Sequence, residues 1–453
     1  MQEMMEFELT KEYRDRFQQA LDEKDDDFII RSLESVQPAD ISALLHEFNS
    51  EESKYVLDRL GSEIGAEIIR DLDSDSRQNF LKIYSPEETA HILNFLNSDD
   101  AADILHELAI KEREEVLAKL DAELRLQVVD LLRYEANVAG GLMAKELIKV
   151  RENWTVNQCI DEIRKQAENV DKFYAVYVVD QADHLIGRVS LKNLVLANAN
   201  RPVSEIIEDE EVVSVETYLE DTEVADVMQK YDLESVPVVN VHGQLVGRIT
   251  IDDVVDVIKE QAEEERQIMA GISEDVEEDD SVWRNTRARL PWLIIGILGG
   301  LMNAKFMGLF EGELARLTAI AFFVPLIQAT GGNVGIQSAS IVVQSLANPG
   351  FLTESLLPRL GKVFLVAMLN GILLALIVFG ANILLFTEWH LSLTVSVSLF
   401  SVVLFASFMG TITPMVLNYF GFNPALASGP FITTINDLLG LTIYFLTVKF
   451  LLL

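Results

Sequence analysis

The chain has 453 residues, enough for about three domains, and a formal net charge of −36. From Leu290 onward it holds only five acidic and five basic residues, so the net charge falls on residues 1–289. Such an acidic part disfavours nucleic acid as a partner, because nucleic-acid binding depends on neutralising phosphates with Lys and Arg, and it favours cations. The single cysteine, Cys159, excludes an intrachain disulfide and a multi-cysteine metal site.

Residues 1–137 consist of short segments whose apolar residues recur at helical spacing. Each segment opens at a turn that carries Ser, Asp or Pro, as in SPEETAHIL and NSDDAADIL. Because stacking such helices buries one continuous apolar stripe, we predict an N-terminal α-helical superhelix. Asp99, Asp100 and Asp103 lie at one helix start, where carboxylates are favourable without any ligand, and they are also candidate regulatory metal ligands.

Residues 138–260 contain an internal repeat. The sequence AVYVVDQADHLIGRVSLKNL, residues 175–194, aligns without a gap onto SVPVVNVHGQLVGRITIDDV, residues 235–254. Each copy is typical of a buried strand, a polar turn, a second strand and a helix, so the region resembles a pair of α/β cystathionine-β-synthase (CBS) modules, 138–198 and 202–260. That resemblance implies an adenine nucleotide such as ATP, with Tyr174, Asn193 and Asp253 as candidate contacts. Thr250 and Asp253 also fit a helix cap that needs no ligand.

Residues 261–285 predict an acidic connecting helix before the membrane. Asp253 and Asp256, at the end of the second CBS module, and Glu264 and Glu265, in the connecting helix, lie at helical spacing. They form either a solvated helix face or one side of a set of apposed carboxylates. Apposed carboxylates repel each other unless a divalent cation bridges them. We therefore name these four residues, with the three aspartates of the helical domain, as candidate regulatory metal ligands.

Five apolar segments follow, each long enough to cross a bilayer. They cover about 290–310, 316–346, 361–386, 394–420 and 430–453, within a predicted five-helix transmembrane domain of residues 286–453. Basic residues lie before the first span and between the second and third, whereas the loop with Glu388 lies on the other side. The positive-inside rule then predicts cytoplasmic N-terminal domains and a C-terminus outside. We expect the membrane to be the cell's inner membrane. The N-terminus is charged, with no apolar core like that of a signal peptide.

The last span carries one carboxylate, Asp437, in the run SGPFITTINDLLGLTIYFLTVKFLLL. A charge in hydrocarbon costs several kcal/mol, so we expect this side chain to face a watery cavity or a bound cation. The second span carries a polar stripe whose amides and hydroxyls either hold helices together or line a wet path. Our candidate pore-lining residues are Thr330, Asn333 and Gln337 in that span, and Gly429 and Thr434 at the start of the last.

Two motifs then make the chain similar to the MgtE family of magnesium channels: PLIQATGGNVGIQSA, residues 325–339, and NPALASGPFITTINDLLGLTIYF, residues 423–445. We therefore predict a multidomain membrane protein, whose domains follow the same order as in that family. The resemblance implies a homodimer with one pore on its two-fold axis, with Asp437 as the pore carboxylate and Mg²⁺ as the ion. It also implies that cytosolic Mg²⁺ bridges the acidic faces and closes the pore.

The sequence also bears on three other classes of function: an enzyme, a coupled carrier and a membrane sensor. An enzyme is disfavoured, because the sequence has no cysteine and histidine cluster, no GxSxG and no Walker motif. A carrier of divalent cations such as Mg²⁺, Mn²⁺ or Co²⁺, coupled to another ion, is the main alternative to a channel. A membrane sensor regulated by the CBS pair is a further alternative, although it leaves Asp437 unexplained.

Overall fold

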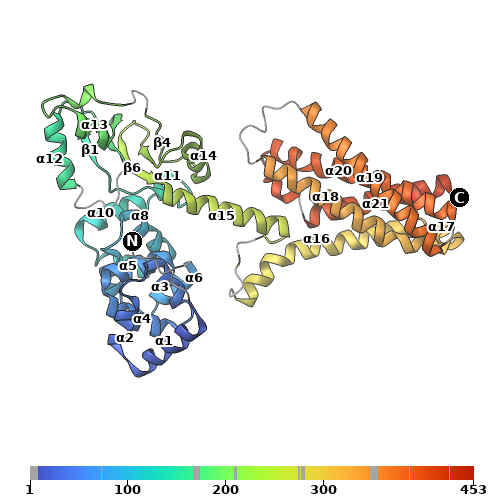
Figure 1. The fold of residues 1–453 in the computed structure, drawn as a ribbon, viewed down its shortest axis with the longest axis horizontal. Helices are drawn as coiled ribbons and strands as arrows, with labels where there is room; N and C mark the ends of the chain where they lie inside the picture. Colours follow the sequence, from blue (N-terminus) through green and yellow to red (C-terminus); the bar gives the residue numbers. More distant parts are fainter. Residues whose placement is uncertain are drawn as a thin grey trace. The chain divides into compact units, whose positions relative to one another are not determined.

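The computed structural model describes residues 9–72, 74–166, 174–208, 212–273, 276, 281–346, 356–386, 388–427 and 429–452. The chain divides into two compact units, Met1–Ile258 and Lys259–Leu453. Figure 1 shows the ribbon of the chain, coloured from the N-terminus in blue to the C-terminus in red.

The N-terminal helices of the first unit form the predicted superhelix. Polar residues cap several of them, as in α4 and α7, where Asn49 pairs with Glu52 and Ser85 with Glu88 in capping boxes. The apolar positions at helical spacing are buried: Leu44 and Leu105 are completely inaccessible. Among the described residues of this domain the helices are α1 (Lys11–Glu23), α2 (Asp26–Leu33), α3 (Pro38–Leu45), α4 (Ser50–Leu60), α5 (Ser62–Asp71), α6 (Ser74–Leu81), α7 (Pro86–Leu93), α8 (Ser98–Glu107), α9 (Ile110–Leu117) and α10 (Ala122–Leu131).

The repeat forms two three-stranded sheets with the same internal register. Val178 pairs with Gly187, and sixty positions later Val238 pairs with Gly247; an irregularity follows at the same point in each copy. The strand orders are β1-β2-β3 and β4-β5-β6. The elements are α11 (Ala139–Leu142), β1 (Lys149–Arg151), α12 (Val156–Gln166), β2 (Val176–Val179), β3 (Leu185–Val189), α13 (Leu191–Leu196), η2 (Val203–Glu205), β4 (Val215–Glu216), α14 (Asp221–Tyr231), β5 (Ser235–Val239) and β6 (Leu245–Thr250).

The second CBS module and the helical domain share one apolar core, which extends from Phe17 to Val257. The first module has a separate core around Cys159, which is completely buried. The hairpin turns join the two modules, since the Leu185 amide donates to the Gly243 carbonyl and the Leu245 amide to the Asp183 carbonyl. The helical domain is thus fixed to the module that carries Asp253.

The helix after β6 differs from the predicted connecting helix. α15 is one continuous helix, Ile251–Ala270, and it ends at Gly271, whose φ is +81°. The predicted boundary at 260–261 therefore falls inside a helix, because no Gly or Pro interrupts residues 251–270. Residues 274–275 and 277–280 of the predicted segment lie outside the described residues, and the next helix already begins at Val282.

The second unit contains the five predicted membrane spans among its described residues. α18, α20 and α21 pack together around an apolar core, while α16 packs on α21 and α19 on α20 (Figure 1). α20 is the most buried of the five spans, and its hydroxyls donate to carbonyls one turn back, as Ser398 does to Thr394. The elements are α16 (Val282–Gly308), α17 (Glu311–Arg316), η3 (Thr318–Phe323), α18 (Val324–Leu346), α19 (Leu356–Phe386), α20 (Trp389–Tyr419), η5 (Pro424–Ala427) and α21 (Pro430–Leu451).

Candidate functional site

Asp437 lies on α21 against a glycine of α18. A Cβ added at Gly332 would be 4.0 Å from Oδ1 of Asp437 and 3.5 Å from Cγ2 of Thr433. The side chain of Asp437 is half-buried, and the described residues offer it no ion pair. To stay ionised, a carboxylate in a membrane span without a basic neighbour needs contact with water or a cation. The arrangement therefore suits a cation site.

Close contacts at glycines hold α18, α20 and α21 together. The side-chain Nδ2 of Asn436 would be 1.9 Å from a Cβ at Gly335, and the Gly335 carbonyl oxygen would be 2.4 Å from a Cβ at Gly410 of α20. Asn436 is 2% exposed, and its amide has no hydrogen-bond partner among the described residues. α18, α20 and α21 thus approach one another as closely as small residues allow.

The candidate pore-lining residues fall into two groups. Asn333 and Gln337 are exposed and Thr330 is partly exposed in the single chain, so α18 presents a polar side that its own unit leaves uncovered. Thr434, by contrast, contacts α16, where a Cβ at Gly299 would be 2.3 Å from its methyl carbon. The structure thus separates Thr434 from the polar side of α18, and its role in lining a pore stays a prediction.

Gly429 lies where the connecting helix meets the last span, within the second unit. Its φ is +60°, and a Cβ there would be 2.6 Å from the carbonyl oxygen of Met269, in the last turn of α15. Only glycine accommodates both that backbone conformation and that contact. The end of α15 is therefore in direct contact with the start of the span that carries Asp437.

A second candidate site lies at the N-terminus of α8, in the first unit. Ser98 donates from its amide and hydroxyl to the carboxylate of Glu146, at 3.2 and 2.8 Å, which brings the chain before β1 onto the start of this helix. The start of α15 brings further carboxylates to the same place, as the electrostatic effects on Asp99 and Asp100 show. We call this set the acidic cluster: Asp99, Asp100, Asp103, Glu146, Asp252 and Asp253.

Burial and mutual repulsion raise the pKa values of Asp99, Asp100 and Asp103. Burial and the charges of Asp100 and Asp253 raise the pKa of Asp99 well above its usual value. Burial, opposed by Arg70, raises the pKa of Asp100 to about 6. Burial and the charge of Asp100 raise the pKa of Asp103 to about 7. Asp100 and Asp103 therefore hold protons below about pH 6 and about pH 7, respectively, unless a cation replaces them.

The structure brings together four of the seven predicted regulatory residues: Asp99, Asp100, Asp103 and Asp253. Asp256 is exposed one turn further along α15, while Glu264 and Glu265 belong to the second unit, so their roles stay predictions. Sequence reasoning missed Glu146, which precedes β1 without any periodic signal. Among the described residues, no three acidic, histidine or cysteine side chains are placed to hold one ion. Side chains of the acidic cluster would have to move to bind one.

Two of the three candidate nucleotide contacts form hydrogen bonds within the chain, and the third is exposed. The Asn193 amide donates to Glu208 at 2.7 Å, and Asp253 accepts from the amide and hydroxyl of Thr250, at 2.9 and 2.7 Å, as the predicted helix cap. Tyr174 is exposed. Nδ2 of Asn193 and Oδ2 of Asp253 are thus already hydrogen-bonded within the chain.

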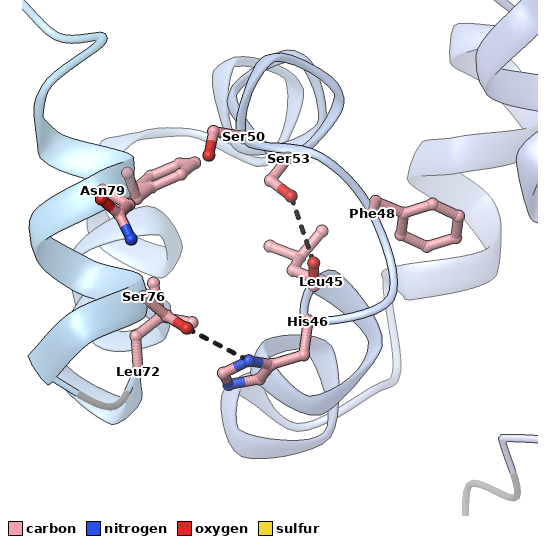
Figure 2. Close-up of a pocket in the computed structure, with 9 residues that line it drawn as sticks. Leu45, His46, Phe48, Ser50, Ser53, Leu72, Ser76 and Asn79 are labelled. Carbon is pink, nitrogen blue, oxygen red and sulfur yellow. Dashed lines mark hydrogen bonds between the residues drawn. The ribbon is translucent and has the colours of Figure 1, made fainter. Parts of the chain in front are cut away.

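A cavity of about 170 Å³ lies elsewhere, among α3 to α6 (Figure 2). The Ser53 hydroxyl in its wall donates to the Leu45 carbonyl at 3.3 Å, and the Ser76 hydroxyl pairs with Nδ1 of His46 at 3.5 Å. None of the predicted site residues lines it. Its polar groups interact with each other, so the cavity adds no candidate binding site.

Family models match three parts of the chain. Residues 36–137 match the MgtE intracellular N domain, residues 138–200 and 203–260 match the CBS domain, and residues 324–447 match MgtE, described as a divalent cation transporter. These matches agree with the predicted helical domain and CBS pair, and with the spans that contain both family motifs.

Relatives cover nearly the whole chain. The magnesium transporter MgtE of Thermus thermophilus is 35% identical over 96% of this chain and 97% of its own length, and that of Enterococcus faecalis is 32% identical over 70% of each. A crystal structure of the cytosolic domain of the Mg²⁺ channel MgtE in complex with ATP is similar, with a TM-score of 0.51 and 36% identity over 53% of this chain and 98% of that one. A structure of the soluble part of a magnesium transporter has a TM-score of 0.50 and 25% identity over 56% and 99%. The chain belongs to the MgtE family of divalent cation transporters, with CBS regulatory domains, and is not an enzyme.

Proposed function

We propose that this protein is a magnesium channel of the cell's inner membrane, formed by two copies of the chain. The observation that carries the proposal is Asp437, half-buried beside Gly332 with no basic partner among the described residues. Two-fold symmetry turns one such carboxylate into a facing pair. Mg²⁺ gives up its waters reluctantly, so a pair of carboxylates with small polar neighbours suits the hydrated ion.

The exposed polar side of α18 supports the dimer. Asn333 and Gln337 are exposed in the single chain although they lie in a membrane span. Amides in contact with lipid are unfavourable, so a second copy or a water-filled path should cover them. We place this side of α18, with Asp437, on the two-fold axis, the soluble unit in the cytoplasm and the C-terminus outside.

We further propose that cytosolic Mg²⁺ closes the pore by binding to the acidic cluster. Without a divalent cation the carboxylates repel each other, and with one they are held together, so the ion favours the conformation that brings them close. α15 carries Asp253 near its start and Met269, which contacts Gly429, near its end. A shift of this helix would therefore reach the span that holds Asp437.

We propose ATP as a second ligand, which binds to the CBS pair. The support is the structural neighbour in complex with ATP, while the hydrogen bonds of Asn193 and Asp253 oppose it. Titration of the full chain with ATP, followed by calorimetry, checks this proposal. Heat of binding that disappears in Asn193→Ala would support it, and no heat would contradict it.

Uptake of Mg²⁺ into liposomes tests the role of Asp437. We expect Asp437→Asn to lose more than about tenfold of the flux, because removing even 1.4 kcal/mol of cation attraction has this effect. Glu311→Gln, which neutralises an exposed acid at the start of α17, should keep the flux. A coupled carrier would show the same loss but would need a gradient of a second ion. Full flux, with unchanged preference over Ca²⁺, in Asp437→Asn would contradict the proposal.

A further inference from the structure

Arg70, on α5, faces the acidic cluster from outside it. Its Nε and Nη2 both donate to Oδ1 of Asp71, each at 3.2 Å, and its Nη1 lies 3.9 Å from Oδ2 of Asp100. Asp71 thus binds Nε and Nη2 of the guanidinium, and Nη1 faces Asp100 in the acidic cluster. Arg70 is 43% and Asp100 26% exposed in their side chains, so water also reaches the pair.

A second arginine holds Arg70 in place. Nη1 of Arg77 donates to the backbone carbonyl of Arg70 at 3.2 Å, while Nη2 forms a less exposed ion pair with Glu107 at the end of α8, also at 3.2 Å. α5 itself is fixed by Ile68 and Ile69, which are completely buried. Arg70 is therefore positioned by α5, α6 and α8 together and does not depend on a flexible loop.

We propose that Arg70 is an internal counter-cation of the acidic cluster, which competes with Mg²⁺ for Asp100 and so sets the Mg²⁺ concentration at which the cluster binds the ion. This inference rests on the proposed regulatory role of the cluster. An oxygen of Asp100 that coordinates the ion has to leave Nη1 of Arg70, because Mg²⁺ requires its ligands in a near-octahedral arrangement. Arg70 keeps Asp71 as a partner when this happens, so displacing it leaves no unpaired charge.

Competition between Arg70 and Mg²⁺ predicts two opposite effects of removing Arg70: lower stability without Mg²⁺ and tighter binding of Mg²⁺. Without Mg²⁺, Arg70 offsets part of the negative charge, so removing it should destabilise the chain. Without Arg70, Mg²⁺ no longer has to displace a guanidinium from Asp100, so binding should tighten even though Arg77 still attracts Asp100 and Asp103. A residue that only supports the fold would weaken binding or leave it unchanged, and this difference makes the proposal testable.

The test is thermal unfolding of the full chain in detergent, at constant ionic strength, as a function of MgCl₂ concentration. For Arg70→Gln we expect a lower melting temperature in EDTA and a midpoint Mg²⁺ concentration about fivefold lower than that of the wild type, the factor typical of an exposed ion pair. Arg70→Lys, which keeps the charge, should lie between the two. Arg59→Gln is the matched control, because Arg59 forms an equally exposed pair with Asp26, on α2, and should leave the midpoint unchanged.

The outcomes separate this inference from the proposed function. A wild-type melting temperature that does not respond to Mg²⁺ would overturn both. A wild type that responds, with an unchanged or higher midpoint in Arg70→Gln, would overturn the role of Arg70 alone. A lower midpoint in Arg70→Gln, with no change in Arg59→Gln, is the result that supports it.

Discussion

Asp103 illustrates how burial of a single carboxyl makes stability depend on pH. Its pKa is about 7 in the folded chain, because it is buried and Asp100 repels its charge, whereas a carboxyl in an unfolded chain has a pKa near 4. A pKa raised by folding means that the folded state binds the proton more tightly. The stability that the proton provides is therefore complete below about pH 4 and is lost as the pH rises through about 7.

We predict that the full chain in EDTA melts at a higher temperature at about pH 5.5 than at about pH 8, because Asp100 and Asp103 hold their protons at the lower pH. Asp103→Asn should flatten this dependence, since an amide does not ionise. Asp226→Asn, which removes one charge from an exposed position on α14, should keep the slope of the wild type. An equal slope in all three proteins would show that the general charge of the chain, and not Asp103, is responsible.

The sequence predicted only part of this residue-level picture. Asp99, Asp100 and Asp103 stand at one helix start, and Asp253 stands at another, so their positions could be predicted from local patterns. Glu146 and Arg70 could not, because nothing near them in the sequence marks them. Their importance comes from tertiary contacts between distant segments, as in the hydrogen bonds from Ser98 to Glu146.

Among the elements, α18, α20 and α21 depend on small residues where they meet. A Cβ at Gly410 would be 2.4 Å from the backbone carbonyl of Gly335 and 2.9 Å from Cβ of Ser338, so the helices would have to separate. The Ser338 hydroxyl also donates to Ser407 of α20 at 3.2 Å. This contact positions the helix that lies against Asp437.

We predict that Gly410→Ala lowers the stability of the purified protein by about 1–3 kcal/mol, the usual cost of overpacking, and reduces Mg²⁺ flux. Gly296→Ala on α16 is the control, because a Cβ there meets nothing within 4 Å. Thermal unfolding in detergent, with liposome uptake, measures both effects. Melting temperatures that are equal in the two variants would contradict the close packing of α18 and α20.

Hydrophobic periodicity and the internal repeat predicted most of the helices and strands. The gapless repeat predicted both CBS modules, and the structure gives the two hairpins the same register. The five spans were also predicted, although the second begins with the 3₁₀ segment η3 before α18. The continuity of α15 was not predicted, because a change from apolar to acidic composition resembles a domain boundary even where the helix does not end.

At the scale of the whole molecule, the charge distribution gives two parts of the chain different roles. Residues 290–453 have few charges and one carboxylate in the last span, whereas nearly all acids lie before Leu290. We therefore assign attraction of the ion to Asp437 and sensing of its concentration to the acidic cluster. α15 is the element that takes part in both units, with its first eight residues in one and the rest in the other.

Recording single-channel currents across a planar bilayer tests both assignments at once. With Mg²⁺ as the permeant ion, the account predicts discrete current steps that disappear when millimolar Mg²⁺ is added on the cytosolic side. The same steps should persist at that concentration when Asp99, Asp100 and Asp103 are all replaced by alanine. Flux without discrete steps would contradict a channel, and closure that is unchanged in the triple variant would contradict sensing by the acidic cluster.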